Sequence, residues 1–153
     1  MNLTPARPGL HVTVAAVIER DGRFLLVEEN VNGRRVLNQP AGHVEPDESF
    51  VEAVIRETLE ETACHFQPES AMGVYRWQIP GTDQIYLRHG FCGRITGHEP
   101  DRPLDAAILR TVWLNREQLQ QQTDRLRSPL VLACIDDYLA GHRYPLALYR
   151  VVD

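Results

Sequence analysis

Apolar residues along the chain follow two different periods, which predict a protein built from both strands and helices. The run 11–18 (HVTVAAVI) is apolar and β-branched, which is typical of a strand buried on both faces. Turn sequences at 20–23 (RDGR) and 32–33 (NG) follow it, so we expect a hairpin and then a short third strand. The predicted strands are 11–18, 24–27, 35–38, 71–79, 84–95 and 108–114, with the last one in the centre of the sheet.

The middle of the chain contains a predicted helix with two contrasting faces. Ser49 and Glu52 match a capping box, and the helix is expected to run from there to about Ala63. At about 100° per residue, one face is apolar enough to pack on a sheet. That face comprises Val51, Val54, Ile55, Thr58, Leu59 and Thr62, whereas the opposite face carries Glu57, Glu60 and Glu61, with only Ala53 between them.

Three carboxylates on one helix face repel one another, and these lie far from the helix N-terminus, where the helix dipole favours anions. A bound divalent cation would relieve this repulsion, because Mg²⁺ prefers oxygen ligands. The alternative from the helix alone is a plain solvated face, as on many glutamate-rich helices.

The C-terminal third predicts two more helices. Asn115 is a candidate cap for a short helix over 116–122. Ser128-Pro129 begins a longer helix, which ends at Leu139 or Ala140, before a glycine. Residues 144–152 are expected to form an extended tail.

Length and charge limit what the chain can be. At 153 residues we expect a single domain, 1–153, with a loose N-terminal segment over 1–9. The net charge of −5 argues against a broad nucleic-acid or anionic-membrane surface, so nucleic acid is an unlikely partner. No apolar run approaches the roughly 18 residues of a membrane span, and the first ten residues lack a signal-peptide core. The three isolated cysteines form no metal or disulfide pattern and suit small buried residues in a reducing cytoplasm.

The stretch 42–64 (GHVEPDESFVEAVIRETLEETAC) resembles the Nudix box, Gly-x5-Glu-x7-Arg-Glu-U-x-Glu-Glu-x-Gly-U, where U is aliphatic. The first glycine and the charged positions match at the required spacing: Gly42, Glu48, Arg56, Glu57, Glu60 and Glu61. Thr58, Ala63 and Cys64 depart from the pattern. A glycine normally ends this helix in the left-handed conformation, which costs alanine roughly 1 kcal/mol. We therefore expect the helix to run on slightly at Ala63 or to end differently.

The resemblance implies an α/β fold, a Nudix-type α/β/α sandwich with a mixed sheet. It implies that Glu60 and Glu61 bind Mg²⁺, or Mn²⁺ in its place, with the carbonyl of Ala41 as a further ligand. Glu57 then either binds metal or takes a proton from the attacking water. Arg56 and Glu48 resemble the family's Arg–Glu pair, whose role is structural or catalytic; we favour the structural one.

Residues outside the box are candidates for completing the site. Glu99, Asp101 and Asp105 lie where many Nudix enzymes draw a further acid, and we favour Asp105; an exposed loop acid is the alternative. Arginines could bind phosphate and aromatic residues could stack on a ring, although aromatic residues in strands are more often core or cross-strand partners. The candidates are Arg35, Arg76 and Arg88 for phosphate, Tyr75, Trp77 and Tyr86 for a ring, with His43, Arg127 and Ser128 as further residues near the site.

Three stretches also resemble one group of bacterial Nudix phosphatases: HVTVAAVI, NQPAGHVEPDE and LRSPLV…YLAGHRYPL. This narrower resemblance implies Mg²⁺-dependent hydrolysis of nucleoside tri- and diphosphates and of thiamine-pathway pyrophosphates, with phosphate as product. The partner is then a small nucleotide or pyrophosphate, and the protein a monomer or homodimer. The alternatives are another Nudix specificity (dinucleotides, nucleotide sugars or capped RNA) and a non-catalytic ligand-sensing module.

Overall fold

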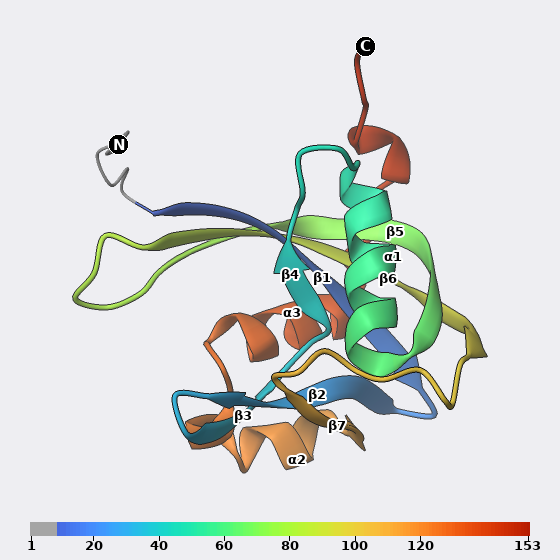
Figure 1. Ribbon diagram of the computed structural model, residues 1–153. Coiled ribbons are helices and arrows are strands. Elements are labelled where there is room, and N and C mark those ends of the chain that lie inside the picture. The colour runs from blue at the N-terminus through green and yellow to red at the C-terminus, as the bar shows by residue number, and fades with distance from the viewer. Residues whose placement is uncertain (1–8) are drawn as a thin grey trace, which may run out of the picture.

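The computed structural model describes residues 9–153 (Figure 1). The strands are β1 (Leu10–Arg20), β2 (Arg23–Val31), β3 (Arg34–Asn38), β4 (Ala41–His43), β5 (Cys64–Gln78), β6 (Ile85–His98) and β7 (Ile108–Leu114). The helices are α1 (Phe50–Thr62), α2 (Arg116–Gln120) and α3 (Leu130–Leu139), with short 3₁₀ turns η1 (Thr123–Arg125) and η2 (Leu146–Leu148). The expected loose segment over 1–9 lies outside the described residues except for Gly9, which belongs to no strand or helix.

The strands form one seven-stranded mixed sheet with the order β3-β2-β1-β6-β5, to which β4 adds on β1 and β7 on β2. β1 and β6 are parallel over a continuous register from Leu10↔Ile85 to Ile18↔Gly93. The other pairs are antiparallel. The predicted β1–β2 hairpin is confirmed, and its turn places Asp21 and Gly22 at positive φ, as a tight two-residue connection requires. The sheet thus brings β4 and β6 to opposite sides of β1.

Hydrophobic cores lie on both faces of the sheet, so the predicted α/β/α sandwich is confirmed. On one face, Val14, Ala16 and Ile18 of β1 pack with Ala53 and Val54 of α1. On the other face, Val17 belongs to a core that α2 and α3 complete, through Leu119, Val131, Cys134 and Ile135. The alternation along β1 explains why its sequence is apolar without a break, because both of its faces are covered. Figure 1 shows α1 standing across the sheet, with α2 and α3 grouped away from it.

Three sequence expectations about the fold are wrong. β5 begins at Cys64, directly after the helix, and not at residue 71. It accommodates Pro68 because β5 is an edge strand whose pairing with β6 is irregular between Pro68 and Ser70. β7 pairs only with β2 among the described strands, so it lies at an edge and not in the centre. The C-terminal tail is not simply extended, because it contains η2 and pairs with β5 through Ala71 and Tyr144.

Both ends of α1 are fixed by local hydrogen bonds. The predicted capping box is confirmed: the Ser49 hydroxyl accepts from the Glu52 amide at 3.1 Å, and the Glu52 carboxylate accepts from the Ser49 amide at 3.4 Å. At the other end, the expectation that the helix runs on or ends differently is wrong: Ala63 adopts the left-handed conformation with φ 60°, and its amide donates to the Leu59 carbonyl, so the helix stops where a glycine would stop it. None of the helices in the described part of the chain has the length and apolar character needed to cross a membrane.

Candidate active site

The acidic residues of α1 lie on a different side of the helix from the one that hydrophobicity predicts. Ala53, Glu57 and Glu61 follow one another at i, i+4 and i+8 and are all turned towards the sheet, with Glu57 only 9% exposed and Glu61 8% exposed. Ile55 and Leu59, expected on the sheet-facing side, are only half-buried. The helix is therefore rotated so that two carboxylates lie at the interface between α1 and β4.

Strand β4 is built to accept these carboxylates. The amide of Ala41 donates to Glu61 Oε1 at 2.9 Å. The flanking residues bond to β1, through Ala16 N to Pro40 O and Val44 N to Val12 O, so in an antiparallel ladder the amide and carbonyl of Ala41 point away from β1. Next to it, a Cβ atom on Gly42 would overlap the Glu57 carboxylate. The first glycine of the box is thus required by the close approach of this side chain.

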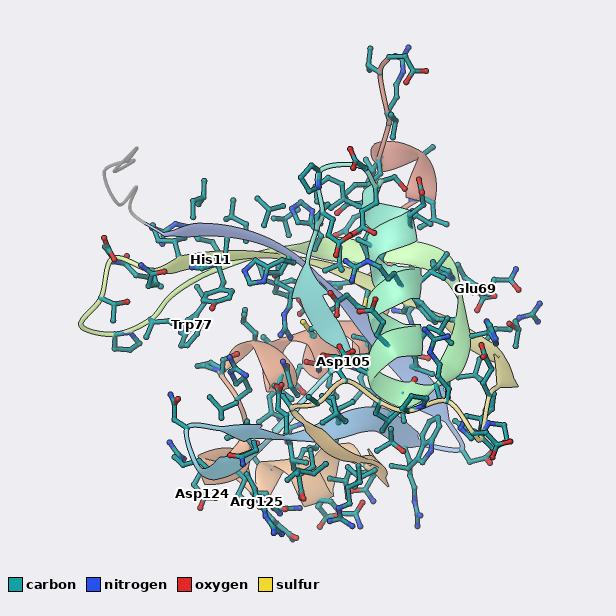
Figure 2. All side chains as sticks on the ribbon, viewed as in Figure 1. His11, Glu69, Trp77, Asp105, Asp124 and Arg125 are labelled. Atoms are coloured by element: carbon teal, nitrogen blue, oxygen red, sulfur yellow. The ribbon has the colours of Figure 1, made fainter. Side chains whose placement is uncertain are left out.

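Asp105 joins the acidic residues from the loop before β7. Its carboxylate and those of Glu57 and Glu60 each offer an oxygen within 4.8 Å of the others. The amide of Asp105 donates to the Glu60 carbonyl at 3.0 Å, one of the helix carbonyls that lacks a partner within the last turn. In Figure 2, Asp105 lies beside α1. Of the three loop acids considered from the sequence, the structure brings Asp105 to Glu57 and Glu60.

Arg56 ties the box loop to the helix. Its guanidinium donates twice to Glu48, at 2.6 and 2.8 Å, and once each to Glu57 at 2.9 Å, Glu60 at 3.1 Å and the His43 carbonyl at 3.1 Å. Hydrogen bonds from Arg56 hold the pKa of Glu48 below its usual value, so Glu48 is ionised and paired. This geometry makes Arg56 the link between loop and carboxylates.

In the metal-free protein, burial and neighbouring negative charges make ionisation of Glu57 and Glu61 unfavourable. Burial raises the pKa of Glu57 to about 7, and the charges of Glu60 and Asp105 add to this, against the opposing effect of Arg56. Burial likewise raises the pKa of Glu61 to about 8, with further contributions from Glu57, Glu29 and Asp105. Several acids converge here around the guanidinium of Arg56, which is a donor set suited to a hard divalent cation. Glu57, Glu60 and Asp105 therefore fit such an ion.

A cleft of about 490 Å³ opens next to the acidic residues. Its lining comes from strands β1 to β6, from α3 and from the segments next to them. The lining residues are Thr13, Glu29, Val31, Asn32, Asn38, Ala41, Gly42, His43, Trp77, Ile79, Tyr86, Arg88, Arg127, Ser128 and Leu130. Ala41 and Gly42 contact the helix carboxylates and also line the cleft. The acidic residues and the cleft thus form one continuous site.

Arg88 is a buried cation in the wall of this cleft. It is 5% exposed, and its guanidinium donates to the amide oxygens of Asn38 at 2.9 Å and Gln39 at 2.8 Å. Gln39 is fixed in turn by donating to the Val131 carbonyl at 2.8 Å. Among the described residues no carboxylate lies within 4.0 Å of Arg88, so its charge is not neutralised by the protein. A buried arginine of this kind is suited to an anionic ligand.

The structure does not bring every candidate residue to the cleft. Trp77 and Arg88 line it, as do Tyr86 and His43. Tyr75 instead packs against the α3 side of the sheet, where its hydroxyl donates to Asp137 at 2.8 Å. Arg35 lines a separate depression with Glu28, Leu109, Arg110 and Arg125; Figure 2 places Arg125 far from Asp105.

Several residues of the cleft were not predicted from the sequence. Glu29 lines it and pairs with Arg127 at 3.2 Å, while Asn38 and Gln39 hold Arg88. Asn38 and Gln39 lie directly before the box, in the run NQPAG. This polar pair next to a glycine-proline loop was the sequence signal that could have marked them as site residues. The contacts of Asn38 and Gln39 with Arg88 depend on the order of the strands in the sheet and could not be predicted from the sequence.

Known proteins resemble this chain in both sequence and fold. The sequence model of the NUDIX domain matches residues 9–133. Phosphatase NudJ of Escherichia coli strain K12 is 42% identical over 138 residues, which cover 90% of this chain and 89% of that protein. A NUDIX hydrolase structure from Nitrosomonas europaea superimposes with a TM-score of 0.90 at 46% identity, covering 93% of this chain and 97% of that one. The E. coli ORF135 protein superimposes with a TM-score of 0.65 at 25% identity, covering 86% and 90%. The chain belongs to the Nudix hydrolase family and is an enzyme homologous to the phosphatase NudJ.

Proposed function

We propose that this protein is a Mg²⁺-dependent phosphatase that hydrolyses the phosphoanhydride bonds of nucleoside tri- and diphosphates and of thiamine-pathway pyrophosphates. The latter are thiamine pyrophosphate and hydroxymethylpyrimidine pyrophosphate. The product is inorganic phosphate, and Mn²⁺ substitutes for Mg²⁺. The observation that carries the proposal is the continuity between the acidic residues of α1 and the cleft, through Ala41 and Gly42.

The chain offers oxygen ligands for the metal ion. Glu57, Glu60 and Asp105 supply carboxylates that already lie close together, and Glu61 and the outward-facing carbonyl of Ala41 lie beside them. When bound, a divalent cation stabilises negative charge on phosphate oxygens and acidifies water. The side chains of the protein position the water molecule, accept its proton and bind the substrate.

Glu57 and Arg56 are our candidates for handling the nucleophile and for holding the site together. Arg56 fixes Glu57 through a 2.9 Å hydrogen bond and Glu48 through two more, so the Glu57 carboxylate has a defined position. From that position Glu57 orients a water molecule and accepts its proton. Glu48 keeps Arg56 in place and thereby acts through it.

The cleft supplies recognition of the rest of the substrate. Arg88 presents an unneutralised positive charge for a phosphate group, and its amide partners keep it rigid. Trp77 and Tyr86, whose rings lie 6.2 Å apart, provide apolar surface for a heteroaromatic ring. Arg35 and Tyr75, which lie outside the cleft, would contact only a ligand that reaches beyond it.

A substrate panel with separate quantification of phosphate and pyrophosphate tests the proposal. We expect Mg²⁺-dependent release of phosphate from thiamine pyrophosphate, hydroxymethylpyrimidine pyrophosphate and common nucleotides. Turnover confined to dinucleotides, nucleotide sugars or capped RNA would assign the enzyme another Nudix specificity. Ligand binding without turnover, in Mg²⁺ or in Mn²⁺, would indicate a sensing module.

We also propose that the protein works in a reducing compartment such as the cytoplasm. Cys64, Cys92 and Cys134 are all free thiols, and Cys92 and Cys134 are buried in the core facing α3. Intact mass and thiol counting on protein purified without reductant would test this, with three free thiols expected.

A further inference from the structure

A row of rings crosses four adjacent strands at one end of the cleft. His43 lies on β4, His11 on β1, Tyr86 on β6 and Trp77 on β5, and the strand register places His11 beside Tyr86 and Tyr86 beside Trp77. His11 stacks on Tyr86 with ring centroids 4.4 Å apart and planes within 9°. Figure 2 shows His11 and Trp77 towards the end of the sheet where a loop joins β5 to β6. His43, Tyr86 and Trp77 line the cleft, whereas His11 contacts His43 and Tyr86 from beside it.

A chain of hydrogen bonds determines which nitrogen atoms of the two histidines carry protons. One terminal atom of the Gln84 carboxamide lies 2.8 Å from Asp83 Oδ1. Because an ionised carboxylate can only accept a hydrogen bond, that terminal atom is the amide nitrogen, Nε2. The other end of the side chain, Oε1, then faces His11 Nε2 at 2.6 Å. Since that oxygen only accepts, His11 carries its proton on Nε2.

The same reasoning extends to His43. In neutral His11 the second nitrogen, Nδ1, is an acceptor, and it lies 2.9 Å from His43 Nε2. His43 must therefore donate from Nε2. In the neutral ring this leaves His43 Nδ1 with a lone pair.

We propose that His43 selects substrates whose ring carries a hydrogen-bond donor, such as an exocyclic amino group. The inference rests on the proposed function, since it names the group recognised within the same cleft. The backbone of His43 is fixed by its carbonyl, which accepts from Arg56, and its ring is fixed by His11. His43 lines the same cleft as Tyr86 and Trp77, and its ring centroid lies 6.4 Å from that of Tyr86, so a ring bound in this cleft lies against a wall that His43 helps to form.

Gln84 and His11 act in this account as positioning residues. A Cβ atom on Gly9 would overlap the Gln84 carboxamide, so the amide is held against the chain as well as by Asp83. Replacing Gln84 by methionine removes the acceptor for His11 and frees the histidine pair to take the other tautomer. Gln78→Met makes the same change at an exposed glutamine of the same hairpin, whose amide donates to the Thr82 carbonyl, and serves as the matched control.

The test compares ATP with purine riboside 5′-triphosphate, which lacks only the 6-amino group. We expect kcat/KM for ATP to be higher by about three- to tenfold, the effect of one hydrogen bond, and to differ mainly in KM. His43→Ala should bring the ratio to about one, Gln84→Met should lower it, and Gln78→Met should preserve it. Equal use of both nucleotides by the unmodified enzyme, or an unchanged ratio in His43→Ala, would overturn the proposal.

A second measurement does not depend on activity. Long-range ¹H–¹⁵N correlation spectra of the imidazole rings at neutral pH should show His43 protonated on Nε2 alone in the unmodified protein and in Gln78→Met. A proton on His43 Nδ1 would overturn the proposal even if the nucleotides were hydrolysed. Hydrolysis of neither nucleotide, with the expected tautomer present, would instead contradict the nucleotide part of the proposed function.

Discussion

The backbone of Gly42 lies directly against the side-chain carboxylate of Glu57, without room for a Cβ atom between them. The contact joins β4, which lines the cleft, to α1, which carries the acidic residues. It also explains physically why glycine stands at the first position of the box.

Gly42→Ala should disable the enzyme more than it destabilises the fold. The new methyl group must displace the Glu57 carboxylate, and a misplacement of about 1 Å can cost on the order of 100-fold in rate. Steady-state kinetics together with the melting temperature check this. Gly97→Ala is the matched control, because its Cβ would meet His65 at an ordinary contact distance. Similar losses in both variants would show that the Gly42 contact has no special role.

Arg56→Ala should lower both stability and rate. The substitution leaves Glu48, Glu57 and Glu60 without the guanidinium that they share, and we expect a loss of about 2 kcal/mol in the free energy of unfolding. Urea denaturation measures this. Arg116→Ala is the comparison, because its ion pair with Asp136 lies at the surface and should contribute no measurable stability. An unchanged unfolding midpoint for Arg56→Ala would contradict the assigned role.

The metal-free protein should become less stable as pH rises from about 5 to about 8. The pKa values of Glu57 and Glu61 are raised in the folded state, to about 7 and about 8, above the roughly 4.3 of an unfolded glutamate. The folded state therefore binds more protons than the unfolded state across this range, and the free energy of unfolding falls as those protons are lost.

Urea denaturation in EDTA at several pH values measures this slope. In Glu61→Gln, whose side chain can still accept from the Ala41 amide, the slope should be shallower than in the unmodified protein. Equal slopes in the two proteins would contradict the burial of an ionisable Glu61. Excess Mg²⁺ should raise stability most at the higher pH values, because metal binding requires the ionised carboxylates.

The acidic site could be predicted because its residues lie close together in sequence. The spacing of Gly42, Glu48, Arg56 and Glu57 identifies the box, and Asp105 could be selected as an acid just before a strand. The rotation of α1 could not be predicted from hydrophobicity, which places carboxylates outside. Arg56, the neighbour of Glu57 on the helix, satisfies the Glu57 carboxylate, and the Ala41 amide of β4 satisfies that of Glu61. The contact with β4 comes from tertiary structure and could not be predicted from the helix alone.

The substrate side of the site was harder to predict, because it depends on which strands are neighbours. Tyr75 and Trp77 have the same chemical plausibility and share one strand, yet Trp77 lines the cleft and Tyr75 contacts Asp137 near α3. The two residues lie two positions apart in a regular stretch of the β5–β6 ladder, so their side chains leave the same face of the sheet. What covers that face at each position, Asp137 at Tyr75 and the cleft at Trp77, depends on tertiary structure. Similarly, the hydrogen bonds that connect Gln84 to His43 through His11 form because β1 lies between β4 and β6.

The most direct test of the account is the Mg²⁺ dependence of phosphate release by the unmodified enzyme and by Glu61→Gln, with Glu52→Gln as control. Glu52 is on the same helix, and glutamine retains its capping role. We expect saturable activation by Mg²⁺ in the unmodified enzyme and in Glu52→Gln. Glu61→Gln should remain folded but lose at least about 100-fold in rate at the same Mg²⁺ concentration. Full activity of Glu61→Gln, or activity of the unmodified enzyme that persists in EDTA, would contradict the account.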